Sequence, residues 1–112
     1  MIPEGQALQI IREKFPDIPV QEANTTLYNI QQVSNYAIWL FTNEDYDAAN
    51  DLMQLVGDIY HHGCPVIKMG MDNILFYNLG TWFSGDKRRD MQQLLPSNVH
   101  EIILKQFISS AI

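Results

Sequence analysis

Hydrophobic residues recur every three or four positions along most of the chain, which is the spacing that one face of an α-helix requires. The first stripe consists of Leu8, Ile11 and Phe15. Pro16 is expected to end this helix, because proline removes a backbone donor and clashes with the preceding turn. A second proline at position 19 favours a linker over residues 17–20. The next stripe predicts a longer amphipathic helix over residues 22–42.

A third stripe predicts a helix that ends at Gly63, where we expect the positive φ that glycine adopts without strain. Pro65 suits the first turn of a fourth helix, since a backbone N–H has no partner there. This fourth helix, over residues 65–83, is apolar on nearly every side and is therefore expected to be central. Gly70 within it is expected to let a neighbouring helix approach closely. The alternative is a break at Gly70 that leaves residues 66–69 as a short strand.

The last part of the chain predicts two further helices. Gly85 is expected to stop the fourth helix, Asp86 to cap a short helix, and Ser97 or Asn98 to cap the terminal one. The connections are short, so neighbouring helices are expected to be roughly antiparallel. The prediction is an all-α fold: residues 1–112 form a compact single-domain bundle of five to six mostly antiparallel helices, with the apolar helix at its centre.

The composition fits a folded globular protein and excludes several classes. The 112 residues are 46% hydrophobic and 18% charged, with a formal net charge of −6. This charge disfavours direct binding to a nucleic-acid backbone and favours basic protein partners. The single cysteine, Cys64, excludes an intramolecular disulfide. We expect a cytoplasmic protein of bacterial style, since neither a signal peptide nor an apolar run of membrane length is visible, and no motif indicates a cofactor.

The charge is distributed unevenly, because no lysine or arginine lies between Phe15 and Ile67. On a third helix that starts near Asn43, four carboxylates of this segment fall within an arc of about 60°. This acidic row consists of Glu44, Asp47, Asp51 and Asp58. It is either a solvated outer face or a docking surface for a basic partner. A divalent-metal site is a third interpretation, although one helix supplies too few converging oxygens by itself.

His61, His62 and Cys64 form the most chemically suggestive cluster of the sequence. Cysteine and histidine act together as a nucleophile and base or as zinc ligands. However, His100 is the only other histidine and no second cysteine exists, so a four-ligand zinc site would need carboxylates. Histidines in the last turn of a helix are also favoured by the helix dipole alone. We therefore expect a structural role and assign no catalytic or metal-binding residue.

Lys87, Arg88 and Arg89 form a basic triplet that is the counterpart of the acidic row. Cations in the first turn of a helix oppose its dipole, so helix propensity does not explain them. The triplet is either a charge cluster neutralised by Asp86 and Asp90 or a secondary contact for an anion or a partner. The partner interpretation includes the acidic row of a second copy. Nothing around the triplet indicates nucleic-acid binding.

Two aromatic residues of the predicted second helix lie beside its buried stripe. They are Tyr36 and Trp39. Either one is a candidate exposed anchor for a partner, because large aromatic side chains dominate many interfaces.

The order of these features is familiar. A leading helix ends in Glu13–Lys14–Phe15–Pro16–Asp17–Ile18, an acidic third helix follows Asn43–Glu44–Asp45, and Leu94–Leu95–Pro96 precedes the terminal helix. This layout resembles a family of small, acidic, uncharacterised helical bacterial proteins, some of which look like immunity proteins of toxin systems. The resemblance covers most of the chain. It implies an all-α fold and no known enzymatic activity, and it supplies no catalytic residue.

Three roles follow from these observations. The leading hypothesis is a protein-interaction module, specifically an immunity-like inhibitor that covers a basic site on a toxin with residues 44–58. The second is a metal-binding protein or small enzyme that uses Asp47, Asp51, Asp58, His61 and His62. The third is a homodimeric structural protein in which the acidic row meets residues 87–89 of a second copy.

Overall fold

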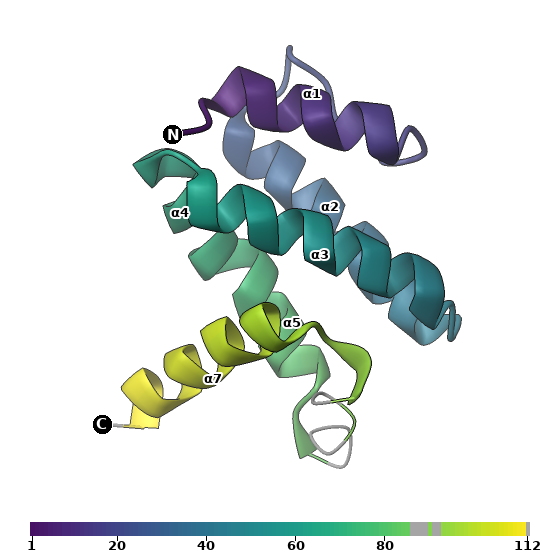
Figure 1. Ribbon diagram of the computed structural model, residues 1–112, viewed down its shortest axis with the longest axis vertical. Helices are drawn as coiled ribbons and strands as arrows, with labels where there is room; N and C mark the ends of the chain where they lie inside the picture. The colour runs from purple at the N-terminus through teal and green to yellow at the C-terminus, as the bar shows by residue number, and fades with distance from the viewer. Residues whose placement is uncertain (86–89, 91–92, 112) are drawn as a thin grey trace.

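Helices account for nearly all of the regular structure in the computed structural model, which describes residues 1–85, 90 and 93–111 (Figure 1). The elements are α1 (Glu4–Lys14), α2 (Thr26–Thr42), α3 (Tyr46–His62), α4 (Pro65–Gly70), the π-helical η1 (Met71–Phe76), α5 (Tyr77–Trp82) and α7 (Ser97–Ala111). The predicted all-α fold is confirmed. Among the described residues, no helix is both long enough and apolar enough to cross a lipid bilayer.

Local capping explains where α2 and α3 begin. The second helix starts at Thr26, four residues later than predicted, because the Thr25 hydroxyl caps it by accepting the backbone N–H of Tyr28 at 3.1 Å. Asp45 caps α3 in the same way through Ala48. Since α3 begins only at Tyr46, the predicted start near Asn43 is wrong by three residues.

The predicted reason for Gly63 is also wrong. This residue ends α3 as expected, but its φ of −77° and ψ of 160° are open to any amino acid. Glycine is required here for space. A Cβ at this position would lie 2.6 Å from the carbonyl oxygen of Ile59 and 3.0 Å from Cγ2 of Ile67. Gly85, by contrast, has the positive φ of 65° that suits a residue beyond a helix end.

The predicted fourth helix is one uninterrupted helical path made of α4, η1 and α5. Pro65 occupies its first turn, and the short strand considered for residues 66–69 does not form. Gly70 continues the helix with α-helical dihedral angles, so no break occurs there. A Cβ on Gly70 would lie 2.5 Å from Cδ1 of Ile30 on α2, which confirms that glycine allows a close helix approach.

This path supplies much of the core but is not buried on every side. Its fully buried residues include Leu75, Phe76 and Leu79. Met69 and Tyr77 are 58% and 64% exposed, so the path has one face toward solvent. All the buried hydrophobic residues of the described part of the chain belong to a single core cluster.

Helix α2 runs beside the α4–η1–α5 path in the same direction (Figure 1). The contacts, in chain order, are Gly70 with Ile30, Asn78 with Ser34, and Trp82 with Phe41. In chain order, α3 lies between α2 and this path, and it runs antiparallel to α2. The tight turn that joins α2 to α3 is closed by a hydrogen bond from the Asp45 N–H to the Leu40 carbonyl at 2.9 Å. The result is an up–down–up arrangement, with α7 lying across α3 and α5.

The N-terminal segment is attached to the far end of α3 by backbone hydrogen bonds. Ile2 pairs with Gly63 as an isolated parallel bridge. The Ile2 N–H donates to the carbonyl of His62, and the Cys64 N–H donates to the carbonyl of Ile2 at 3.0 Å. These bonds hold the start of α1 next to the turn between α3 and α4.

Candidate functional site

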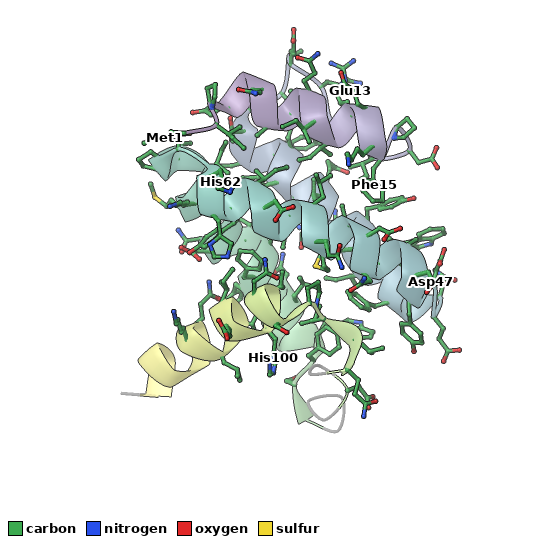
Figure 2. The ribbon with its side chains drawn as sticks, viewed as in Figure 1. Met1, Glu13, Phe15, Asp47, His62 and His100 are labelled. Carbon is green, nitrogen blue, oxygen red and sulfur yellow. The ribbon has the colours of Figure 1, made fainter. Side chains whose placement is uncertain are left out.

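The acidic row lies on the outer side of α3. The helix buries Ala49, Leu52, Met53, Val56 and Ile59 against the core. Because a helix repeats about every 3.6 residues, the opposite face must point to solvent. Asp47, Asp51 and Asp58 are all exposed, and Figure 2 shows Asp47 at the periphery near the start of α3.

Glu44 is close to the other three carboxylates in sequence, but it is not part of α3. It precedes α3 in the turn after α2, and its φ of 59° is the only positive φ of a non-glycine residue among the described residues. The prediction that all four carboxylates share one helical arc is therefore wrong for Glu44. It is exposed in the turn that immediately precedes α3.

The charges of the row are not compensated within the described part of the molecule. The carboxylates of Asp47, Asp51 and Asp58 accept no hydrogen bond and form no ion pair with any described residue. Asp47 is in the first turn of α3, where the helix dipole favours a negative charge. Asp47 and Asp51 are one turn apart and repel each other, by roughly 0.2–0.5 kcal/mol in an isolated helix. This arrangement leaves the row available to external cations.

The basic triplet lies outside the described residues. Lys87, Arg88 and Arg89 therefore receive no structural assignment, and their role as a secondary contact remains a prediction.

His61, His62 and Cys64 lie at the turn between α3 and α4, where they differ in exposure. His61 and His62 are exposed in the last turn of α3, while Cys64 is half-buried immediately before α4. Across the described ranges, no group of three or more histidine, cysteine, aspartate or glutamate residues could hold a metal ion. Asp58 is one turn before His61 and His62 on α3, whereas Asp47 and Asp51 are two or more turns further away.

The two candidate aromatic anchors differ in exposure. Trp39 is 57% exposed, as expected, whereas Tyr36 is half-buried; the role of Trp39 as a partner anchor stays a prediction. Their rings are 5.6 Å apart and tilted by 35°. Tyr36 therefore supports Trp39 from the side of the core.

The sequence did not predict a polar cluster around Asp72, in the π-helical turn. The Asp72 carboxylate accepts the hydroxyl of Tyr60 on α3 at 3.2 Å and the amide Nε2 of Gln106 on α7 at 3.2 Å. The same Nε2 donates to the Asp72 carbonyl at 2.9 Å. One side chain of η1 thus connects three helices. The signal in the sequence was the polar pair Asp72–Asn73, which interrupts an otherwise apolar run.

This cluster keeps the Tyr60 phenol protonated. Burial, together with the hydrogen bond to Asp72 and the negative charge of that carboxylate, raises the pKa of Tyr60 to about 12. The Nζ of Lys68 lies 6.0 Å from the centre of the Tyr60 ring. Beside the cluster is a depression of about 520 Å³ whose lining includes His61 and Lys105. Since Tyr60 and Gln106 already donate hydrogen bonds to the Asp72 carboxylate, the role of the cluster is to hold α3, η1 and α7 together.

The architecture defines an all-α protein with an exposed acidic helix. The chain belongs to a family described as a domain of unknown function (DUF7674), which matches residues 8–109. This confirms the expected membership of an uncharacterised family. No curated protein and no solved structure matches the chain.

Proposed function

We propose that this protein is a protein-interaction module that binds a basic protein through the acidic row. In its most concrete form it is an immunity-like inhibitor that covers a positively charged site on a toxin in the cytoplasm. One observation supports the proposal above others: Asp47, Asp51 and Asp58 are exposed on one side of a rigid helix without a described counter-charge.

The geometry of the row suits a surface that presents several lysine or arginine side chains. Asp47 and Asp51 are neighbours on the helix, with Cβ atoms roughly 5–6 Å apart. Asp58 lies two turns further, so the row spans about 16 Å along the axis. Glu44, in the turn that precedes α3, adds a further exposed carboxylate near the start of the row. A toxin that acts on nucleic acid needs a positive cleft, which carboxylates complement in place of phosphates.

Long-range attraction adds to these contacts. The net charge of −6 and the absence of lysine and arginine between positions 15 and 67 give the α3 side a negative field. Such a field accelerates the encounter with a basic partner and makes the association rate fall as ionic strength rises. The proposal assigns no enzymatic activity and no cofactor to the protein.

The test compares three immobilised baits in extracts of the native source. They are the wild-type protein, Asp47→Lys with Asp51→Lys, and the control Glu13→Lys with Glu101→Lys. The control makes the same change in net charge at exposed positions of α1 and α7, and Figure 2 shows Glu13 on the outer side of α1. We expect a basic protein that wild type and control capture equally and that the α3 variant loses. Equal capture by all three baits would refute the role of the row.

The captured protein then gives a kinetic test. Its association rate with the wild type should fall steeply between low and physiological salt, while the α3 variant should associate slowly at both. Size-exclusion chromatography of the free protein separates this proposal from the homodimer. A dimer that dissociates at high salt would favour pairing of the row with residues 87–89 of a second copy.

A further inference from the structure

A cavity of about 480 Å³ lies between α1, α2 and the α4–η1 stretch, on a different part of the molecule from the acidic row. Its apolar walls include Ala7 and Ile11 from α1, Ile30 and Val33 from α2, and Met71 and Leu75 from η1. The cavity opens to solvent at its rim, where Glu4 and Glu22 are exposed. A space of this size is typical of small-molecule sites, which range from about 300 to 1,000 Å³.

The attachments of α1 explain why the helix does not collapse into this space. At its start, Ile2 is fixed to the turn between α3 and α4 by backbone hydrogen bonds. The Thr26 hydroxyl at the start of α2 donates to the Glu4 carboxylate. Between these points only Ala7 and Ile11 of α1 are buried. The small side chain of Ala7 leaves room between α1 and α2.

The far end of α1 is fixed through the segment that follows it. Ile18 and Val20 of this segment are buried in the core. The buried Asn29 side chain holds Gln21 with two hydrogen bonds, donating to its carbonyl at 2.9 Å and accepting its N–H at 3.1 Å. Both ends of α1 are therefore fixed, and the helix spans the cavity as a rigid cover.

The polar part of the cavity carries negative charge. Glu4 and Glu22 line it with exposed acidic side chains, and Thr26, whose hydroxyl donates to Glu4, lines it as well. No lysine, arginine or histidine is among the described residues that line it. Arg12 lines an adjoining depression, together with Glu22, but not the cavity itself. An anionic head group would meet like charge here, whereas an ammonium group would meet two carboxylates.

We infer that this cavity is a binding site for a small amphiphile that has an apolar body and a protonated amine. The alkyl part lies against Ile30, Val33 and Met71, where it removes apolar surface from water. The ammonium group lies at the Glu4 and Glu22 end, where it donates hydrogen bonds to the carboxylates. This site is independent of the proposed role of α3, since none of the acidic row lines it.

Three octyl compounds with different head groups test the inference. They are octylamine as its hydrochloride, 1-octanol and sodium octanoate, each titrated into the protein below its micelle concentration at pH 7 by calorimetry. We expect octylamine to bind at least tenfold more tightly than the other two. The double variant Glu4→Gln, Glu22→Gln should remove this preference, while Glu101→Gln on the exposed face of α7 should keep it. Equal binding of all three compounds to the wild type, or no binding of any, would overturn the inference.

A second pair of variants locates the site. Val33→Phe adds volume inside the cavity, and Val66→Phe makes the same change at a position that is 42% exposed on α4 and does not line it. We expect Val33→Phe to reduce octylamine affinity at least tenfold and Val66→Phe to leave it unchanged. Ala7→Leu fills the cavity from the opposite wall and replaces Val33→Phe if that variant does not fold. Unchanged affinity in a folded filling variant would show that the amine binds elsewhere.

Discussion

Replacement of Gly63 with alanine introduces a methyl group where α3 turns into α4. The new Cβ would lie 2.6 Å from the carbonyl oxygen of Ile59 and 3.0 Å from Cγ2 of Ile67. The Ile59 oxygen is a backbone atom of the last helical turn, so it cannot move as the end of a flexible side chain can. The backbone at Gly63 has a φ of −77°, so dihedral strain plays no part in the expected effect.

The magnitude follows from three contributions. Forcing extra volume into a packed site costs about 1–3 kcal/mol. Alanine restricts the unfolded chain relative to glycine, which returns roughly 0.4–1 kcal/mol. Relief of the clash by moving Gly63 would instead strain the hydrogen bonds that join Ile2 to residues 62–64, each worth roughly 0.5–1.5 kcal/mol. Subtracting the second contribution from the first leaves an expected net destabilisation of about 0.5–2.5 kcal/mol.

Urea unfolding followed by circular dichroism measures this loss. Gly5→Ala is the matched control, because Gly5 lies within α1 and a Cβ there meets no atom within 4 Å. Alanine at that position should stabilise the protein by up to about 1 kcal/mol through helix propensity. Gly63→Asn separates the two reasons for a glycine. If a positive φ were needed, asparagine would be better tolerated than alanine, whereas the clash makes both unfavourable. Wild-type stability of Gly63→Ala would refute the steric explanation.

Two further predictions concern hydrogen-bonded side chains at helix contacts. Tyr60 keeps its proton in the folded state up to a pKa of about 12, against an ordinary value of 10.0, so stability should fall as pH rises through this interval. Tyr60→Phe should make that fall shallower in urea titrations at pH 9 to 12, and an identical slope in both proteins would contradict the assignment. Asn29→Leu should cost about 1–3 kcal/mol, because it leaves the N–H and carbonyl of Gln21 without their partner. If the variant had the unfolding midpoint of wild type, water would be replacing the Asn29 side chain as partner of Gln21 with no loss of stability, which would contradict the prediction.

The ends of helices could be predicted from the sequence wherever a single residue restricts the local backbone. Pro16 and Pro65 determine their boundaries by geometry that needs no tertiary contact. The start of α2 was misplaced because a hydrophobic stripe does not show which hydroxyl will cap the helix, and Thr25 does so. The exposure of Asp47 and Asp51 followed directly from the helical period.

Features that depend on contacts distant in sequence could not be predicted from the sequence. Gly63 fits either a positive φ or a close contact, and only the position of Ile67 decides between them. The Asp72 cluster joins residues 12 and 34 positions away, through a π-helical turn that no local pattern indicated. The cavity under α1 depends on the way both ends of that helix are attached, which hydrophobic periodicity does not encode.

The pairing of Ile2 with the end of α3 has a consequence for biosynthesis. Helix α1 leaves the ribosome before α3, so the backbone that anchors Ile2 is made about 60 residues later, and closing such a loop carries an entropic cost. Helices α2 and α3 are joined by a tight turn, so they can associate earlier. We therefore expect α1 to dock late during synthesis and to detach early under stress. When urea is added, limited proteolysis should cut the segment between α1 and α2 before it cuts within α2 or α3, because that segment is protected only while α1 is docked.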